Sequence, residues 1–364
     1  MLISELETPA VVIDLDVMER NLSRVADYCR RQKLRLRPHT KTHKIPDLAK
    51  RQIASGATGI TVAKIGEAEV MIDAGITDIL IAYPIVGHEK AERLAKLAER
   101  ANIAVSLDSE EAARAVSEAV AARNLKTGIL VELDVGFGRC GLANEDELLA
   151  LARKVSDLAG LEFRGLMFFP GQFVVGPQER SALLTQVNSM LDRTLETFQR
   201  AGLPISTVSG GSTPTAYDAH LFHGVNESRP GMYIFNDRNM VGVGVASVED
   251  CALSVVVTVV SNSIAGRAIV DGGSKTFSSD RYLAGDGRGF GLVKEDPAAE
   301  MEGFSEEHGH LNIKHSTHEY KVGERLTIIP NHACSTVNMH DEVYGVRDQR
   351  VDTVWQVAGR GKVR

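Results

Sequence analysis

Short runs of apolar and β-branched residues alternate with longer amphipathic segments through the first two thirds of the chain. In several of those longer segments, for example 88–100 and 109–123, apolar residues recur three and four positions apart, as on one face of a helix. Ser109, followed by Glu110 and Glu111, is typical of a helix N-terminus. The pattern predicts eight strands, at 34–39, 59–62, 78–82, 103–107, 128–134, 164–169, 205–209 and 231–235.

This alternation of strand and helix favours parallel strands, and eight such units close most simply into a (β/α)8 barrel. An open doubly wound sheet is the alternative, because periodicity does not distinguish a closed sheet from an open one. The fold class predicted is therefore α/β.

The alternation of strand and helix patterns ends after about residue 239. Strand-like runs at 255–260, 267–271, 325–329, 342–347 and 351–357 are separated by Gly, Asn and Asp, which predicts a smaller all-β domain. The run 9–14 is also strand-like and 17–31 reads as a helix; this early strand fits either the barrel or the β domain. Residues 285–309 are rich in Gly, Asp and Glu and predict a long loop.

Composition narrows the class of protein. The 364 residues are 43% hydrophobic and 24% charged, as in ordinary folded proteins, and the net charge of -7 favours no nucleic-acid partner. The first residues carry acidic groups and lack the apolar stretch of a signal peptide, and the longest apolar run, 251–260, is about half a membrane span. Four scattered cysteines without a CxxC pair favour a reducing compartment, so we expect a cytoplasmic protein with no membrane partner.

A dense basic segment, Arg-Pro-His-Thr-Lys-Thr-His-Lys at 37–44, ends the first predicted barrel strand. Because the carboxyl ends of barrel strands hold the chemistry, Lys41 is well placed to act as a nucleophile or to form a Schiff base. A solvated basic turn is the competing interpretation.

A turn of sequence Ser-Gly-Gly-Ser-Thr-Pro-Thr at 209–215 follows the seventh predicted strand. Gly210 and Gly211 let the backbone approach a ligand closely, and the N–H and hydroxyl groups of Ser212 and Thr213 could hold a phosphate there. An ordinary Gly/Ser/Thr turn is the alternative. The turn is neither GxGxxG nor a Walker loop, so dinucleotides and ATP are not favoured.

His332 and Cys334 stand two positions apart. On an extended strand their side chains would point to the same face, which suits two ligands of one metal, and an N/S pair favours zinc over magnesium or calcium. The alternative is a packed histidine and a buried thiol.

Two further residues have open interpretations. Arg139 lies among glycines at the end of the fifth strand and could reach an anionic or phenolic oxygen, or be a surface turn arginine. Tyr233 could bind a phosphate oxygen or only pack.

The acidic run 305–309 is either a lid or a solvated loop.

Taken together, these segments resemble the D-threonine aldolase and D-serine dehydratase family of fold-type III pyridoxal-phosphate (PLP) enzymes. The matching segments occur in order over nearly the whole chain, and the lysine octet and the Pro-Asn-His-Ala-Cys segment are the most specific. The segments are 8–12, 37–44, 134–141, 209–213, 229–233, 305–309 and 330–334.

The resemblance implies an alanine-racemase-like barrel over 25–240 and a β domain, carrying the metal site, built from 1–24 and 241–364. Lys41 would hold PLP as a Schiff base and later act as the base, with His39 beside it and Arg139 next to the ring. The phosphate would lie on Gly210, Gly211, Ser212 and Thr213, assisted by Tyr233. His332 and Cys334 would bind a divalent metal, with zinc favoured and manganese or magnesium as alternatives.

The implied activity is a lyase acting on D-3-hydroxy amino acids. Aldolases of the family typically have His-x-Asp where this chain has His332 and Cys334, and dehydratases have His-x-Cys, so β-elimination is slightly favoured over retro-aldol cleavage. Phe169 stands where the family usually has a tyrosine near the cofactor ring. The alternatives are D-threonine aldolase proper, an amino-acid racemase of the same fold, and a non-catalytic PLP-binding protein. By analogy with the family we expect a homodimer.

Overall fold

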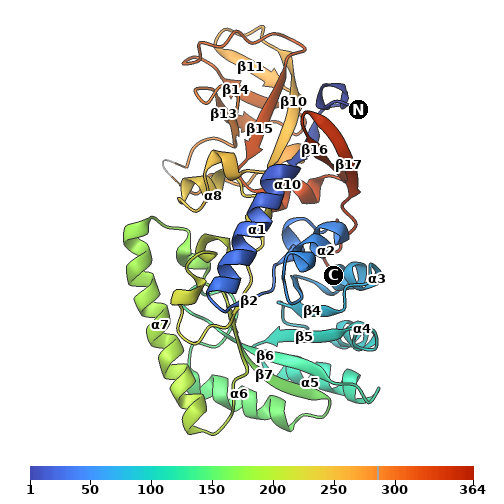
Figure 1. Ribbon diagram of the computed structural model, residues 1–364, viewed down its shortest axis with the longest axis vertical. Coiled ribbons are helices and arrows are strands. Elements are labelled where there is room, and N and C mark those ends of the chain that lie inside the picture. Colours follow the sequence, from blue (N-terminus) through green and yellow to red (C-terminus); the bar gives the residue numbers. More distant parts are fainter. Residues whose placement is uncertain (285–286) are drawn as a thin grey trace. The chain divides into compact units, whose positions relative to one another are not determined.

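The computed structural model describes residues 1–284 and 287–364 (Figure 1). These residues form two compact units. The β unit comprises Met1–Ser23, Thr42–Ile45 and Met232–Arg360, and the barrel unit comprises Arg24–Lys41, Pro46–Gly231 and Gly361–Arg364. Both units are therefore built from separate stretches of the chain.

The barrel unit is a sheet of eight parallel strands among the described residues, in the order β2-β9-β8-β7-β6-β5-β4-β3. The two ends of this sheet meet through a parallel bridge between His39 and Thr61, where the Thr61 N–H donates to the Pro38 carbonyl at 2.8 Å. This confirms the (β/α)8 barrel rather than an open sheet. The strands are β2 (Arg35–Leu36), β3 (Ile60–Val62), β4 (Asp78–Ile81), β5 (Asn102–Leu107), β6 (Thr127–Leu133), β7 (Leu161–Phe168), β8 (Thr207–Gly210) and β9 (Glu227–Ser228).

Amphipathic helices follow most of these strands, as predicted. Their starts have local causes: Ser109 caps one helix by accepting from the Ala112 N–H, and Asn144 caps the next by accepting from Asp146 and Glu147. The helices are α1 (Leu15–Arg31), which begins in the β unit, α2 (Pro46–Ala54), α3 (Ile65–Asp73), α4 (His88–Ala98), α5 (Glu110–Ala121), α6 (Glu145–Asp157) and α7 (Pro177–Arg200).

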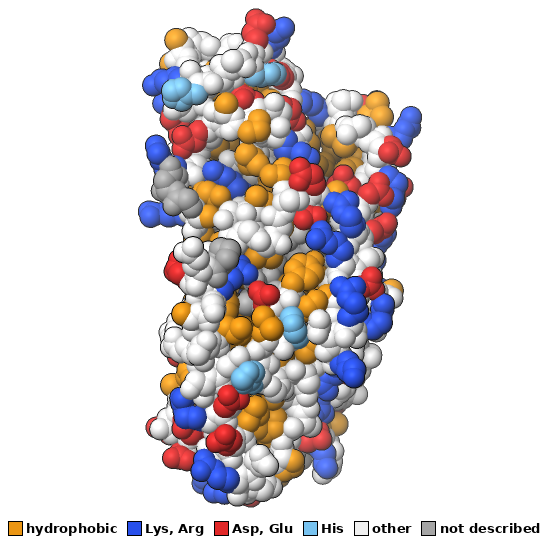
Figure 2. Space-filling view, turned by 60° about the vertical axis from the view of Figure 1, so that its left-hand side comes forward, with side chains coloured by type: hydrophobic (Ala, Val, Ile, Leu, Met, Phe, Trp, Pro, Cys, Tyr) orange, Lys and Arg blue, Asp and Glu red, His pale blue; other side chains and the backbone are white. Residues whose placement is uncertain are grey.

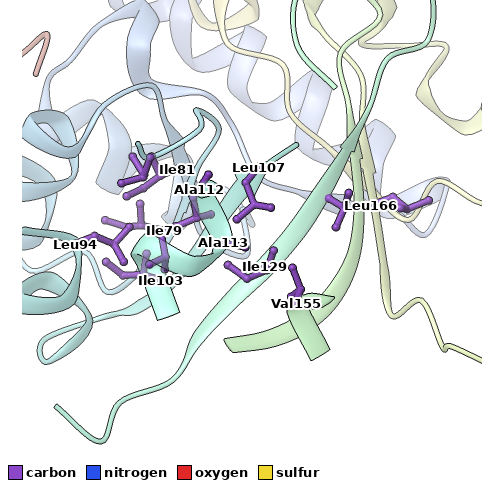
Figure 3. Close-up of a cluster of buried hydrophobic side chains, with 14 of the residues drawn as sticks. Ile79, Ile81, Leu94, Ile103, Leu107, Ala112, Ala113, Ile129, Val155 and Leu166 are labelled. Carbon is purple, nitrogen blue, oxygen red and sulfur yellow. The ribbon is translucent and has the colours of Figure 1, made fainter. Parts of the chain in front are cut away.

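The main core of the barrel unit lies between strands and helices (Figure 3). Ile79 and Ile81 of β4 point outward to this layer, whereas Leu80 between them joins Leu130 and Met167 in a small separate cluster. This alternation is the period-2 pattern of a barrel strand. The inward positions nearer the carboxyl ends of the strands are polar, and they carry the candidate site.

The eighth strand was predicted at 231–235, and this prediction is wrong. The strand is β9, Glu227–Ser228, and Met232–Ile234 forms a 3-10 turn, η6. Two features hide this strand from the hydrophobic pattern. It is short and polar, and Pro230 just beyond it has no N–H with which to extend a ladder.

The β unit contains a nine-stranded sheet in the order β11-β14-β13-β12-β15-β10-β1-β16-β17. Strand β1 (Ala10–Asp14) lies between β10, to which it is antiparallel, and β16, to which it is parallel. The early strand therefore belongs to the β domain. The other strands are β10 (Leu253–Ser261), β11 (Arg267–Val270), β12 (Gly291–Val293), β13 (Glu300–Phe304), β14 (Gly309–Asn312), β15 (Arg325–Pro330), β16 (Glu342–Arg347) and β17 (Arg350–Gln356).

The prediction of one long loop over 285–309 is also wrong, because strands interrupt it. The segment contains β12 and β13 and reaches the start of β14, while residues 285–286 lie outside the described part of the chain. The acidic run 305–309 is the connection between β13 and β14, where Glu306 and Glu307 pair with Lys275. Short helices complete the unit: α8 (Arg238–Gly242), α9 (Ser274–Phe277) and α10 (Ala333–Met339).

Short 3-10 turns link several of these elements in both units. They are η1 (Ile3–Glu5), η2 (Thr40–Thr42), η3 (Gly171–Phe173), η4 (Thr213–Thr215), η5 (Ala219–Leu221) and η7 (Val248–Asp250), besides η6. No helix in the described residues is long and apolar enough to cross a membrane. Figure 2 shows positive and negative side chains interspersed over the visible face, in keeping with the modest net charge.

Candidate functional site

The interior of the barrel holds a chain of buried, mutually bonded polar groups. Arg229, 5% exposed, donates to the Ser209 Oγ at 2.6 Å and to the Phe168 carbonyl at 2.7 Å. Ser209 in turn donates to Glu227 at 2.6 Å, and Arg37 donates to the same carboxylate at 2.9 Å. Burial lowers the pKa of Arg229 to about 10, although the nearby carboxylates of Glu227 and Glu132 act to raise it. The guanidinium is therefore still charged at neutral pH. Buried charges require such partners.

Lys41 lies on η2, just beyond β2, at the carboxyl end of a barrel strand as predicted. Its Nζ is 5.8 Å from the centre of the Phe169 ring, and its backbone N–H donates to the His39 Nδ1 at 3.4 Å. Burial lowers the pKa of His39 far below its ordinary value, and the charges of Lys41, Arg229 and Arg139 lower it further. The imidazole of His39 is therefore neutral at physiological pH.

Arg139 lies over the same aromatic ring as Lys41. Its Cζ is 4.3 Å from the centre of the Phe169 ring, and its Nη2 is 3.9 Å from a carboxylate oxygen of Glu132. Glu132 is 3% exposed; burial raises its pKa, and the charges of Arg139 and Arg229 oppose that effect. The barrel unit thus brings Lys41 and Arg139 together over the Phe169 ring, with His39 beside Lys41.

The loop carrying Arg139 has a local cause. The carboxylate of Asp134 at the end of β6 accepts hydrogen bonds from the N–H groups of Gly136, Phe137 and Gly138, at 3.0 to 3.1 Å. Asp134 thereby holds the turn that precedes Arg139 and so places the arginine.

The Gly-Gly-Ser-Thr turn follows β8 and leads into η4, also at the carboxyl end of the barrel. Gly210 packs so closely on Phe168 that a Cβ would overlap the ring. Gly211 has φ +94°, and a Cβ there would lie 3.0 Å from the Ser228 Oγ. The Ser228 hydroxyl is buried and, within the described residues, has no hydrogen-bond partner. A bare glycine backbone beside an unsatisfied buried hydroxyl fits an anionic oxygen.

His332 and Cys334 were predicted to share one face of a strand, and this is wrong. His332 lies between β15 and helix α10, as the N-cap residue of that helix, and Cys334 is the second residue of α10. The two side chains nevertheless interact. Burial disfavours the charged imidazole, but Cys334 and then Asp280 favour it more, and the pKa of His332 is raised to about 11. The Cys334 Sγ also donates to the Thr42 Oγ1 at 3.3 Å.

Two aspartates near this pair were not found from the sequence. Asp280 accepts from the His332 Nδ1 at 2.6 Å, and that hydrogen bond lowers the pKa of the carboxyl to about 2. Asp237 is fully buried and accepts from the Ala333 N–H at 2.9 Å; burial raises its pKa to about 6. Both lie more than 50 residues from α10 in sequence, so no local pattern signals them. No group of three or more His, Cys, Asp or Glu residues with metal-binding geometry occurs in 1–284 or 287–364.

Tyr233 lies on η6 and is 3% exposed. It belongs to the β unit, whereas the 210–213 turn belongs to the barrel unit. Its assignment to the phosphate remains a prediction of the resemblance.

Comparisons with known proteins follow the two units. A profile described as alanine racemase, N-terminal domain, matches residues 13–239, and one described as a putative serine dehydratase domain matches 252–346. The chain is 37% identical to the D-threo-3-hydroxyaspartate dehydratase of Delftia sp. (strain HT23), over 91% of this chain and 92% of that protein.

Solved structures agree with this assignment. The D-threonine aldolase of Filomicrobium marinum is 36% identical with a TM-score of 0.93, covering 99% of this chain and 98% of that one. A cysteine-to-alanine variant of D-threo-3-hydroxyaspartate dehydratase, described as the metal-free form, is 34% identical with a TM-score of 0.90, covering 98% of both chains. The chain therefore belongs to the D-threonine aldolase and D-serine dehydratase family of alanine-racemase-like, PLP-dependent lyases.

Proposed function

We propose that this protein is a PLP- and divalent-metal-dependent lyase of D-3-hydroxy amino acids, and that it catalyses β-elimination in preference to retro-aldol cleavage. One observation carries the proposal. Cys334 contacts Thr42, and Thr42 is the residue that follows Lys41 in the chain. Within the β unit, a soft metal donor therefore contacts the residue that follows the candidate Schiff-base lysine in the chain.

The barrel residues fit PLP. Lys41 would hold its aldehyde carbon covalently, Arg139 would lie beside the ring, and the 210–213 turn would hold the phosphate, with His39 and Tyr233 in support. The unsatisfied Ser228 hydroxyl next to Gly211 is the feature of the turn that supports this placement. When bound, PLP supplies an electron sink for charge that develops at the substrate Cα.

The protein residues have distinct tasks in such a reaction. Lys41 would hold PLP, and its amine would be the base that removes the proton from the substrate Cα. The neutral imidazole of His39 holds the backbone N–H of Lys41 and adds no positive charge beside it. Arg139, which contacts Phe169 and Glu132, would place its guanidinium beside the cofactor ring.

The β unit offers the metal donors His332 and Cys334. A thiolate and an imidazole favour zinc, with manganese or magnesium as the alternatives. A divalent ion held there would supply Lewis-acid assistance to the β-hydroxyl oxygen. The metal-free form of the cysteine variant of D-threo-3-hydroxyaspartate dehydratase supports metal binding in a relative. Cysteine at 334, where aldolases of the family typically have aspartate, favours dehydration.

We further propose a cytoplasmic homodimer. The four cysteines are free in the structure, as a reducing compartment allows, and dimers are usual for this fold type.

The test is to incubate the purified protein with PLP, zinc or manganese, and D-threonine. We expect 2-oxobutanoate and ammonia; glycine and acetaldehyde would instead identify an aldolase, which contradicts the preference for elimination. Lys41→Ala should abolish turnover and the visible absorbance of bound cofactor, while Lys50→Ala, on the exposed surface of α2, should change neither. D/L interconversion that survives chelation would identify a racemase, and bound PLP without turnover would identify a binding protein.

A further inference from the structure

The side chain of Asp280 makes a short hydrogen bond with His332 in the β unit. Its Oδ2 lies 2.6 Å from the His332 Nδ1, and the Ser335 Oγ donates to the same oxygen at 2.5 Å. Ser335 is also 3.3 Å from the His332 Nδ1. The imidazole is therefore held from one side by a carboxylate that is itself fixed by a hydroxyl from the first turn of α10.

The backbone of Asp280 is tied to the same stretch of chain. Its carbonyl accepts from the Asn331 Nδ2 at 3.0 Å, and Asn331 precedes His332. The same amide nitrogen donates to the Gly289 carbonyl at 2.9 Å. Asp280 is thus bonded through its backbone to residue 331 and through its side chain to residue 332, which distinguishes it from an exposed ion pair whose two side chains are free to separate.

This contact determines which ring nitrogen can bind a metal. A carboxylate accepts only, so the Nδ1 of His332 carries a proton in this contact. To bind a metal the imidazolium must lose its other proton, and that loss leaves the lone pair on Nε2. A carboxylate behind a metal-binding histidine in this way fixes the tautomer and the ring orientation and increases the basicity of the ligand atom.

We propose that Asp280 is a positioning residue for the metal site: it holds the proton of His332 on Nδ1 and orients Nε2 to share a metal ion with Cys334. This rests on the metal site of the proposed function. The Oδ2 of Asp280 is shared by His332 and Ser335, so this oxygen acts on the histidine and not on the ion.

The test measures metal affinity, with the PLP-loaded full chain dialysed against a chelator and then titrated with zinc in competition with a chromophoric chelator. Asp280→Ala should weaken zinc binding by about 10- to 100-fold. Asp280→Asn, which keeps an acceptor oxygen at the same place, should fall between this variant and the parent protein. Ser335→Ala, which leaves the Asp280 to His332 contact in place, is the matched control and should lose less than Asp280→Asn.

Two further readouts separate positioning from a general structural role. The visible absorbance of bound PLP and the thermal unfolding temperature should be the same in Asp280→Asn as in the parent protein, and this isosteric variant carries the test if Asp280→Ala does not fold. Unchanged zinc affinity in both variants would overturn the proposal. Loss of zinc binding as complete as in His332→Ala would also overturn it, because Asp280 would then be a ligand. A parent protein that binds no zinc or manganese would instead refute the proposed function.

Discussion

The carboxylate of Asp237 accepts the backbone N–H of Ala333, 96 residues further along the chain, at 2.9 Å. Its other oxygen accepts the Met240 N–H at 3.0 Å, so the same residue caps α8. One buried side chain therefore fixes both the start of helix α8 and Ala333, the first residue of α10. Ala333 stands between the two candidate metal donors in the sequence.

We predict that Asp237→Ala destabilises the protein by about 3 kcal/mol, because it removes a cap and leaves two buried N–H groups unsatisfied. Urea unfolding measures this free energy. Asp73→Ala, which removes only an exposed ion pair with Arg100, should cost less than about 1 kcal/mol. Equal losses in the two variants would show that the cap is not important.

Gly211→Ala should weaken PLP binding by at least about tenfold. An alanine at 211 must adopt a φ near +94°, which is unfavourable for a residue with a side chain. Its methyl group would also lie 3.0 Å from the Ser228 Oγ, in the turn assigned to the phosphate. Titration of the apo protein with PLP, followed by absorbance, measures the change. Gly176→Ala, where a Cβ meets open space at the start of α7, is the control, and a comparable loss there would argue against a phosphate site at 210–213.

Phe169 stands where the family usually has a tyrosine, and we expect the aromatic face, not a hydroxyl group, to matter at this position. Lys41 and Arg139 both lie over its ring, and a cation over an aromatic ring gains about 0.5 to 2 kcal/mol. We expect Phe169→Leu to weaken PLP binding several-fold and Phe169→Tyr to leave it within about twofold. The reverse order, with the tyrosine variant more impaired, would contradict this role.

Cys334→Asp should change the metal preference of the site. Replacing a thiolate by a carboxylate removes the softer donor, so zinc affinity should fall at least about tenfold and manganese should compete better. The same variant should increase glycine and acetaldehyde relative to 2-oxobutanoate from D-threonine. Zinc affinity equal to that of the parent would show that the thiol is not a ligand.

Glu132 should make stability depend on pH in a defined direction. Burial raises the pKa of this carboxyl in the folded state above its ordinary value of 4.5. The folded protein then holds the proton more tightly than the unfolded chain, so the contribution of Glu132 to stability is present below pH 4.5 and is lost as pH rises through the raised pKa. The free energy of unfolding of the parent minus that of Glu132→Gln should therefore fall as pH increases above 4.5. A difference that is constant with pH would contradict this.

The parts of the fold predicted from the sequence are those with a strong local pattern. The barrel strands from β3 to β7 have apolar outer faces, and Ser109 is a local cap, so both were recognisable. Strand β9 was misplaced because it consists of two polar residues, of which Glu227 is bonded to Arg37 and Ser209. Strands β12 to β14 were missed because they are short and half-exposed.

The site shows the same division. Lys41 and Gly211 follow predicted strands, and this position together with the basic segment 37–44 and the glycine turn 209–215 indicated them. Helix α10 and the contact of Asp280 with His332 depend on residues remote in sequence, which a one-dimensional pattern does not contain.

The place of β1 in its sheet has a consequence for the order in which the protein folds during synthesis. This strand is synthesised before its partners β10 and β16, which follow about 240 and 330 residues later. The barrel strands, between residues 35 and 228, can pair while β1 still waits for β16. Folding of the newborn chain should therefore begin in the barrel unit and end with the closing of β16 on the oldest strand.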